Sequence, residues 1–346
     1  MPRLTAARGP ATPRGLRSSS PVLLLSVLAL LLAAAVLGAC AVGTEPFPLG
    51  TTVSALLGGA EPWQRAVVLD VRLPRVLIAA LGGAGLALSG AALQGLLQNP
   101  LADPSVLGVS SGATLGAVLA LYLVPVASLV IVPAASFVFA IGAVALTVRL
   151  ARAGGASGTS LLLAGVAVAS AGSALTSFVL SLSLAEWELG MQVLSWMMGG
   201  LEGRSWPHLF AMAPPVVIGS LACLRHGRDL DALALGEETA ASLGRDVGAA
   251  RRALLVLTSL VTAAVASTIG SVAFVGLVVP HALRLGARLS YRALLGASAI
   301  GGALLLVLSD TLCRALASEV DLRPGTISSA IGAPFFLWLL VRRKPA

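Results

Sequence analysis

Charged side chains are scarce in this chain. Of its 346 residues, only 11% are Asp, Glu, Lys or Arg, whereas 57% are hydrophobic, and the mean hydropathy is +0.94. A soluble globular domain carries about 25% charged residues. An ordinary soluble core has no room for this much apolar surface. The composition therefore excludes a soluble domain and predicts a polytopic membrane protein.

Aromatic residues are also few, at 4%, whereas there are 38 glycines. Small residues let membrane helices approach closely, and close van der Waals packing is what holds helices together in lipid. Gly108, Gly112 and Gly116 follow one another at four-residue steps. This spacing predicts a helix-packing face and indicates no chemistry.

The three cysteines, Cys40, Cys223 and Cys313, lie far apart in or beside apolar runs. Such isolation excludes a disulfide framework and a cysteine metal site. Residues 37–40 read Leu-Gly-Ala-Cys after a basic and then an apolar stretch, as a lipoprotein signal does. A membrane helix ending near Cys40 is the favoured interpretation, because further apolar spans follow and need no lipid anchor. Lipidation of Cys40 is the alternative.

Catalytic motifs are absent from the sequence. It contains no GxxxxGK[ST] phosphate loop, no HExxH, no GxSxG and no paired-carboxylate cluster. Ionisable residues within the apolar runs are nearly absent, which argues against an ion-coupled transporter. Asp310 stands four residues before Arg314, and an i, i+4 ion pair explains it. His281 is interpreted as a structural histidine. An intramembrane enzyme using His281 or Asp310 is a remote alternative.

The net charge of +8 suggests no nucleic-acid partner, because the basic residues lie in loops and form no stripe with aromatic residues. Residues 1–20 form a basic tail rich in Pro, Ser and Gly, which we expect to be disordered. Residues 21–346 are expected to form one transmembrane domain. It contains ten apolar runs, each near the ~20 residues that cross a bilayer: 21–43, 73–93, 105–124, 128–149, 160–183, 191–224 (only partly in the membrane), 253–270, 272–285, 293–316 and 326–341.

Ten spans place both termini on the same side of the membrane. Most of the 23 lysine and arginine residues then fall on that side, whereas the opposite loops hold most of the acidic residues outside the 225–252 segment. The positive-inside rule places the termini and residues 225–252 in the cytoplasm. We expect the bilayer to be the inner, cytoplasmic membrane.

Residues 225–252 form the longest polar interruption of the apolar part. Leucines at 230, 233 and 235, a break at Gly236 and a helix-like run through Leu243 predict two short helices joined by a glycine. Such a structured loop at a membrane surface is typical of a segment that another protein binds. The flanking arginines at 225, 228, 251 and 252 are interpreted as cytoplasmic anchors of the neighbouring spans.

Two further polar groups leave alternatives open. Arg72 and Arg75 begin the second span with no acidic residue three or four positions on, so either docking of a partner or interfacial snorkelling explains them equally well. Gln94, Gln98 and Asn99 end the same span, where a capped turn is favoured over the lining of a pathway.

Several motifs together resemble one family. In order they read VRLPR, GxxLxxSGAALQGLLQNPLADPxxLGxxSGA, LLLAGVA, WMMGGL, LALGEETAxSLG, FVGLVVPHxxR and IGAPFFLWLL. Each is modest alone, but the ordered set, covering residues from about 45 to the end, resembles the FecCD-type permeases of ABC importers for iron–siderophore, haem or corrinoid.

The resemblance implies an all-α fold of about ten transmembrane helices that works as a homodimer or close heterodimer. It implies two ATP-binding cassette ATPase subunits below and an extracytoplasmic substrate-binding (lipo)protein above, with no enzyme activity and no cofactor in the permease itself. Ferric siderophore is the expected cargo, haem or corrinoid (vitamin B12) the alternative, and an ion-coupled secondary transporter a remote one.

The resemblance also implies roles for particular residues. Residues 233–244 match the ATPase-coupling helices, with Leu233, Leu235, Gly236, Glu237, Glu238, Ala240, Leu243 and Gly244 as the coupling residues. Arg72, Arg75 and Arg314 match the arginines that receive the binding protein. Thr159 and Ser160 match an inner gate. Residues 321–325 read Asp-Leu-Arg-Pro-Gly where the family has Glu-Leu-Pro-x-Gly, so Arg323 is an extra arginine at the outer face.

Overall fold

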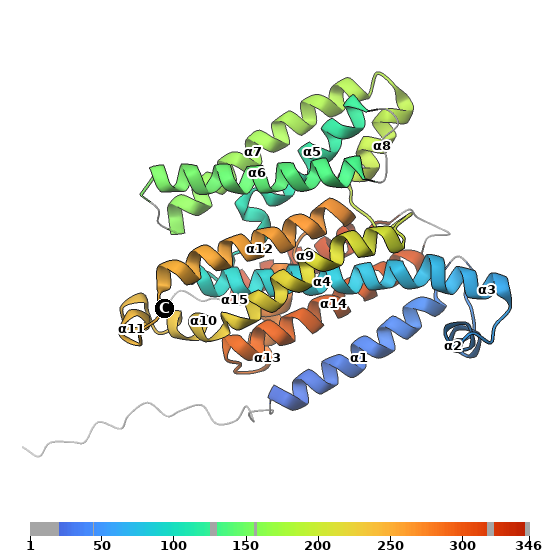
Figure 1. Cartoon of the computed structure of the whole chain (residues 1–346), viewed down its shortest axis with the longest axis horizontal. Coiled ribbons are helices and arrows are strands. Elements are labelled where there is room, and N and C mark those ends of the chain that lie inside the picture. The colour runs from blue at the N-terminus through green and yellow to red at the C-terminus, as the bar shows by residue number, and fades with distance from the viewer. Residues whose placement is uncertain (1–20, 44, 125–129, 156–157, 317–321, 343–346) are drawn as a thin grey trace, which may run out of the picture.

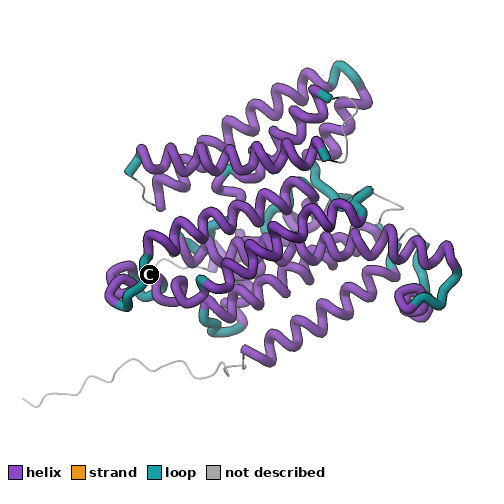
Figure 2. Tube along the Cα trace, viewed as in Figure 1, coloured by secondary structure: helices purple, strands orange, loops and turns teal. Residues whose placement is uncertain are grey.

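The described part of the chain is built from helices and contains no strand (Figure 2). A computed structural model describes residues 21–43, 45–124, 130–155, 158–316 and 322–342. The predicted basic tail, residues 1–20, lies outside the described residues. The prediction of an all-α polytopic protein is confirmed.

Each of the ten predicted spans corresponds to a helix. These helices are α1 (Pro21–Ala41), α4 (Leu73–Leu96), α5 (Val109–Leu123), α6 (Ile131–Ala153), α7 (Gly158–Ser183), α9 (Trp206–Arg225), α12 (Val247–Ile269), α13 (Val275–Gly286), α14 (Tyr291–Ala315) and α15 (Pro324–Arg342). Seven of them are long and apolar enough to cross a membrane, and α5 and α13 are shorter apolar helices. The predicted run 191–224 separates into α8 and α9, because the glycine-rich residues 199–203 interrupt it.

Short helices cap both ends of these spans. They are α2 (Leu49–Leu57), α3 (Pro62–Ala66), the π-helical η1 (Val67–Arg72), the 3₁₀-helical η2 (Pro104–Leu107), α8 (Trp187–Met197), α10 (Gly227–Leu233) and α11 (Glu237–Ser242). Figure 1 shows α10 and α11 at one end of the molecule, and α2 and α3 at the opposite end. We call these the α10 end and the α2 end.

The buried centre of the fold is α4, which packs along α14 and also contacts α9, α12 and α13. Its contact with α14 requires glycine on both helices. A Cβ atom built on Gly83 would overlap the carbonyl oxygen of Gly302, and one built on Gly302 would overlap that of Gly83. Backbones this close exclude side chains, so α4 and α14 form a tightly packed pair.

Helices α5, α6 and α7 form a second group that lies on α12 (Figure 1). Gly112 and Gly116 pack against the backbone of α6 near Phe139 and Ala135, which confirms the predicted packing face. Gly108 is not part of it, because it precedes α5 with a left-handed φ of 82° that a glycine adopts without strain.

Candidate functional site

Arg72 lies at the α2 end and caps the last turn of α1. Its guanidinium donates to the carbonyl oxygens of Cys40 (3.0 Å), Ala41 (2.9 Å) and Glu45, and it lies over the ring of Phe47. The last four carbonyls of a helix have no partner within it, and α1 has no basic residue of its own there. Arg72, about thirty residues later in the sequence, therefore provides the positive charge that stabilises the C-terminal end of α1.

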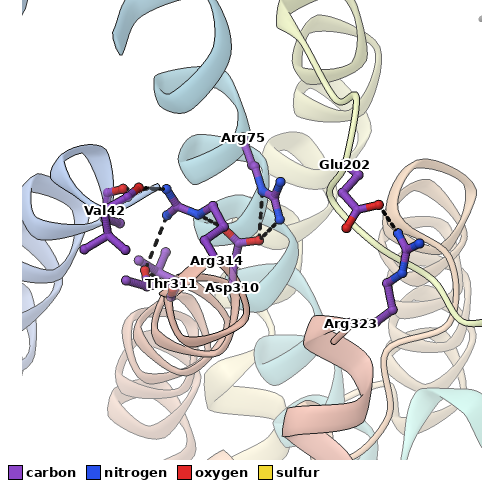
Figure 3. Close-up of polar contacts among 9 residues, drawn as sticks. Val42, Arg75, Glu202, Asp310, Thr311, Arg314 and Arg323 are labelled. Carbon is purple, nitrogen blue, oxygen red and sulfur yellow. Dashed lines mark hydrogen bonds and ion pairs between the residues drawn. The ribbon is translucent and has the colours of Figure 1, made fainter. Parts of the chain in front are cut away.

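Arg75 and Arg314 share one carboxylate, that of Asp310 (Figure 3). Arg75 on α4 lies 2.8 Å from Asp310 Oδ1, and Arg314 lies 2.9 Å from Oδ2 on the same helix, α14. The predicted i, i+4 pair is thus confirmed. Arg314 also donates to the Ala39 and Val42 carbonyls, so it completes the cap on α1.

Arg72 and Arg75, which have no acidic residue three or four positions on, both have intramolecular partners. Their partners are far away in sequence, beyond the three or four positions over which a helix pattern can be read. Among the predicted docking arginines, Arg75 has the most exposed side chain, at 16%, against 9% for Arg314. Arg72 as a whole residue is 7% exposed. All three line one cavity of about 460 Å³ at the α2 end. Docking itself stays a prediction.

The extra arginine of the 321–325 stretch also has a partner. Arg323, which directly precedes α15, is buried and forms an ion pair with Glu202, as Figure 3 shows. Asp321 lies outside the described residues. Glu202 lines the cavity formed by Arg72, Arg75 and Arg314, which we call the arginine cavity, and also a neighbouring cavity lined by Arg323.

At the opposite end, α10 and α11 are the two short helices predicted around Gly236. Gly236 has φ +107° and ψ 150°, a combination essentially restricted to glycine. Leu233 and Ala240 are buried and hold the pair to the membrane helices. The other predicted coupling residues are wholly or partly accessible, with Leu235 at 67% and Leu243 at 60% exposure. Two large exposed leucines, with the exposed Glu237, Glu238 and Gly244 around them, suit a protein-binding surface.

The α10–α11 pair is fastened to both members of the α4–α14 pair. Gln98, just after α4, donates to the carbonyl oxygen of Leu233. The carboxylate of Asp231 on α10 accepts from the backbone N–H of Tyr291 at 2.6 Å, which caps the start of α14. Gly227 allows the backbone of α10 to approach that of Arg292. These contacts attach α10 to the adjacent ends of α4 and α14.

Ion pairs give this loop its shape as well. Arg251 at the start of α12 pairs with Glu237 of α11, and Arg245 lies 3.2 Å from Asp229 of α10. The interpretation of Arg251 as an anchor alone is therefore incomplete. Arg251 is part of the loop's own structure.

The other predicted site residues lie near this end or at turns. Thr159 is exposed in the first turn of α7, and Ser160 donates to the Gly154 carbonyl at 2.7 Å. Asn99 accepts from Leu101 N–H at 3.0 Å, which confirms the predicted turn. Gln94 is buried on α4. Its side chain donates to the Gly276 carbonyl and accepts from Arg284, and these hydrogen bonds link α4 to α13.

The remaining chemical candidates are embedded in packing. The ring of His281 lies edge-on to Phe335, with centroids 6.1 Å apart. The three cysteines are buried, and Cys40 is 1% exposed at the end of α1. Among the described residues, no group of three or more His, Cys, Asp and Glu side chains could hold a metal ion.

Sequence reasoning missed the contacts that join distant segments. Arg75–Asp310, Arg323–Glu202 and Asp231–Tyr291 span 235, 121 and 60 residues respectively. A single sequence holds no periodic signal over such separations. The sequence did contain a chemical indication of these contacts. Asp310 and Arg323 are charged residues close to apolar runs, where charged side chains usually pair.

A buried pair of membrane helices, crossed by others and attached at one end to a short helical loop, is the architecture of a multi-pass membrane protein. The model of the FecCD transport family matches residues 29–342. This chain belongs to that family, whose members are permease subunits of ABC importers and not themselves enzymes.

Two relatives and one structure show how near the match is. The cobalamin import system permease protein BtuC of Halobacterium salinarum is 43% identical over 87% of this chain and 81% of its own. The hemin transport system permease protein HmuU of Yersinia pestis is 35% identical, over 94% and 97%. A metal-chelate type ABC transporter solved in an inward-facing conformation is 30% identical, with a TM-score of 0.82 over 93% of this chain and 99% of that one.

Proposed function

We propose that the chain imports a metal chelate across the inner membrane, driven by a separate ATPase. The observation that carries this proposal is the α10–α11 loop, which exposes apolar side chains yet is fastened to the ends of α4 and α14. Because the sequence has no phosphate loop of its own, ATP binds elsewhere. The permease supplies the pathway, and it needs no cofactor.

The proposed partners follow from the two ends of the molecule. Two ATP-binding cassette subunits bind the α10–α11 loops of two permease copies at the cytoplasmic side. A substrate-binding (lipo)protein docks at the α2 end, around Arg75 and the cavity that it shares with Arg72 and Arg314. Both termini are cytoplasmic in this arrangement. Thr159 and Ser160, at the start of α7, serve as the inner gate.

The α4–α14 pair provides the mechanical link. At the α10 end it is tied to the coupling loop through Gln98 and Asp231, and at the α2 end Arg75 and Asp310 join the two helices. Closure of the ATPase dimer displaces α10, and the packed pair carries that displacement towards the outer face. Interfaces this tightly packed switch between discrete arrangements and do not deform gradually.

The cargo is proposed by class. The similar proteins named above import cobalamin and hemin, and the similar structure is of metal-chelate type. Their common chemistry is a metal ion enclosed by a large organic ligand, which includes the ferric siderophore expected from the sequence. Such a cargo carries its own metal ligands, so the pathway needs none.

Reconstitution tests this function. The permease, its ATPase and its binding protein are placed in proteoliposomes with labelled ferric siderophore, haem or cobalamin outside. We expect uptake of one chelate that requires ATP inside and stops with an ATPase subunit unable to hydrolyse ATP. Uptake driven by an ion gradient without the ATPase would instead identify a secondary transporter.

A further inference from the structure

A second cavity at the α2 end has no role in the mechanism described so far. Its volume is about 400 Å³, and its walls come from α5, α8, the loop before α9, the end of α12 and the start of α15. The polar side chains in this lining are Gln192, Ser195, Glu202, Arg204 and Arg323, and Trp196 supplies an aromatic wall. The cavity thus combines cations, neutral hydrogen-bonding groups and an apolar surface.

Arg204 is a cation without a carboxylate partner among the described residues. Its guanidinium carbon lies 5.1 Å from the centre of the Trp196 ring, and one terminal nitrogen lies 3.2 Å from His208 Nε2. Its Nε is buried and has no hydrogen-bond partner. Burial lowers the pKa of Arg204 from its usual value, which reflects the cost of removing this charge from water. A ring contact offsets only part of that cost.

Arg323 places a second cation in the same lining. It is 8% exposed and is held by Glu202 and by the hydroxyl of Ser195 at 3.3 Å. The Glu202 side chain, by contrast, is 49% exposed and lies at the rim shared with the arginine cavity. The described lining thus holds Arg204 and Arg323 beside one carboxylate, Glu202, which pairs with Arg323 and is the more exposed member of that pair.

We propose that this cavity binds a carboxylate group of the metal-chelate cargo at the outer mouth of the permease, with Arg204 as the principal contact and Arg323 as the second. The proposal rests on the function proposed above and narrows its cargo to anionic chelates. A guanidinium is suited to a carboxylate because its planar array of donors matches the two oxygens. Trp196 offers a flat apolar surface to the body of the chelate, and Gln192 and Ser195 can hydrogen-bond its polar edge.

The test uses two probes that differ only in charge. Haem carries two carboxylates, whereas its dimethyl ester has nearly the same size and no negative charge. Binding of each to the full permease in lipid nanodiscs is followed by quenching of tryptophan fluorescence. We expect the wild type to bind haem about tenfold or more tightly than the ester, as a charge-assisted hydrogen bond provides. Arg204→Gln should remove most of that preference and leave binding of the ester unchanged.

A second variant avoids any loss of the Arg204 packing. Gln192→Glu places a negative charge in the lining at an exposed position, and it should weaken haem binding by a similar factor. Gln64→Glu on α3 adds the same charge at the α2 end outside the cavity and should have no effect. Equal wild-type affinities for haem and ester, or binding of neither probe, would overturn the proposal. Loss of ATP-dependent uptake bears instead on the proposed function, which this binding test does not touch.

Discussion

At the scale of single residues, Asp310 is a buried carboxylate that pairs with two arginines. Its side chain is 2% exposed, and it lies between Arg75 and Arg314. Removal of one member of a buried charged group leaves the others uncompensated, which costs more than the group contributes when it is intact. Asp310 therefore matters chiefly because two arginines depend on it.

Asp310→Asn should destabilise the fold by about 3 kcal/mol, because it leaves two desolvated guanidinium groups without a counter-charge. Thermal unfolding of the purified permease in detergent measures this change. Asp70→Asn is the control, since Asp70 is exposed on η1 at the same end, and it should shift the transition little. Equal shifts for the two variants would show that the Asp310 network contributes nothing specific.

Two of the outer arginines, Arg75 and Arg72, should differ in effect when each is changed to glutamine. Arg75→Gln should weaken docking of the binding protein about tenfold, about 1.4 kcal/mol, because Arg75 is the most accessible of the three. Arg72→Gln should lower the unfolding temperature, because Arg72 caps the end of α1.

Titration calorimetry with the permease in nanodiscs measures the docking, and Arg65→Gln, exposed on α3, is the matched control. Unchanged docking by Arg75→Gln would remove Arg75 from the docking surface.

At the scale of elements, the α10–α11 loop combines exposure with firm attachment. Its apolar side chains Leu235 and Leu243 project into solvent, while Leu233 and Ala240 are buried. An element that only joined two spans would have no need of both properties. The combination supports the proposed coupling role, in which the exposed surface contacts the ATPase and the buried surface contacts the membrane helices.

Glu237→Arg should uncouple ATP hydrolysis from uptake while the protein still folds, since an exposed ion pair contributes no more than about 1 kcal/mol to stability. Uptake and hydrolysis are measured together in proteoliposomes. The exchanged pair, Glu237→Arg with Arg251→Glu, restores the intramolecular contact and should remain uncoupled if Glu237 contacts the ATPase. Full uptake by the single variant would contradict its assignment to coupling.

The attachment of α10 to α14 can be tested on one helix. Asp231→Ala removes the acceptor of the Tyr291 N–H at the start of α14 and leaves the Ser290 cap in place, which should cost about 1 kcal/mol and reduce uptake per ATP hydrolysed. Asp229→Ala is the matched control, because the described ion pairs of Asp229, with His226 and Arg245, lie within the 225–252 segment. Identical transport by the two variants would show that α10 does not act through α14.

At the scale of the whole molecule, the membrane orientation makes a prediction for both ends. A single cysteine introduced as Glu238→Cys should react from the cytoplasmic side only, and one introduced as Arg65→Cys from the outside only. An impermeant maleimide applied to intact cells and to inverted vesicles distinguishes the two. The three native cysteines are buried, so the background should be low. Reaction of both positions from one side would refute the ten-span topology.

The sequence by itself determined the membrane class, the order of the spans and the two short helices around Gly236. Hydrophobic runs, proline and glycine breaks, and charge asymmetry act over a few residues, so a single chain displays them. It also indicated the family, because the spacing of its motifs is a property of the chain alone. The turn at Asn99 and the pair Asp310–Arg314 were predictable for the same reason.

The tertiary structure decided which charges meet. Arg72 and Arg75 looked unpaired because their partners lie 27 to 235 residues away, on α14 and around the end of α1. The same is true of Arg323 and Glu202, and of the cap that Asp231 places on α14. An unpaired charge is costly in a low-dielectric interior. Which partner a buried charge meets is selected by packing, and packing depends on all the helices at once.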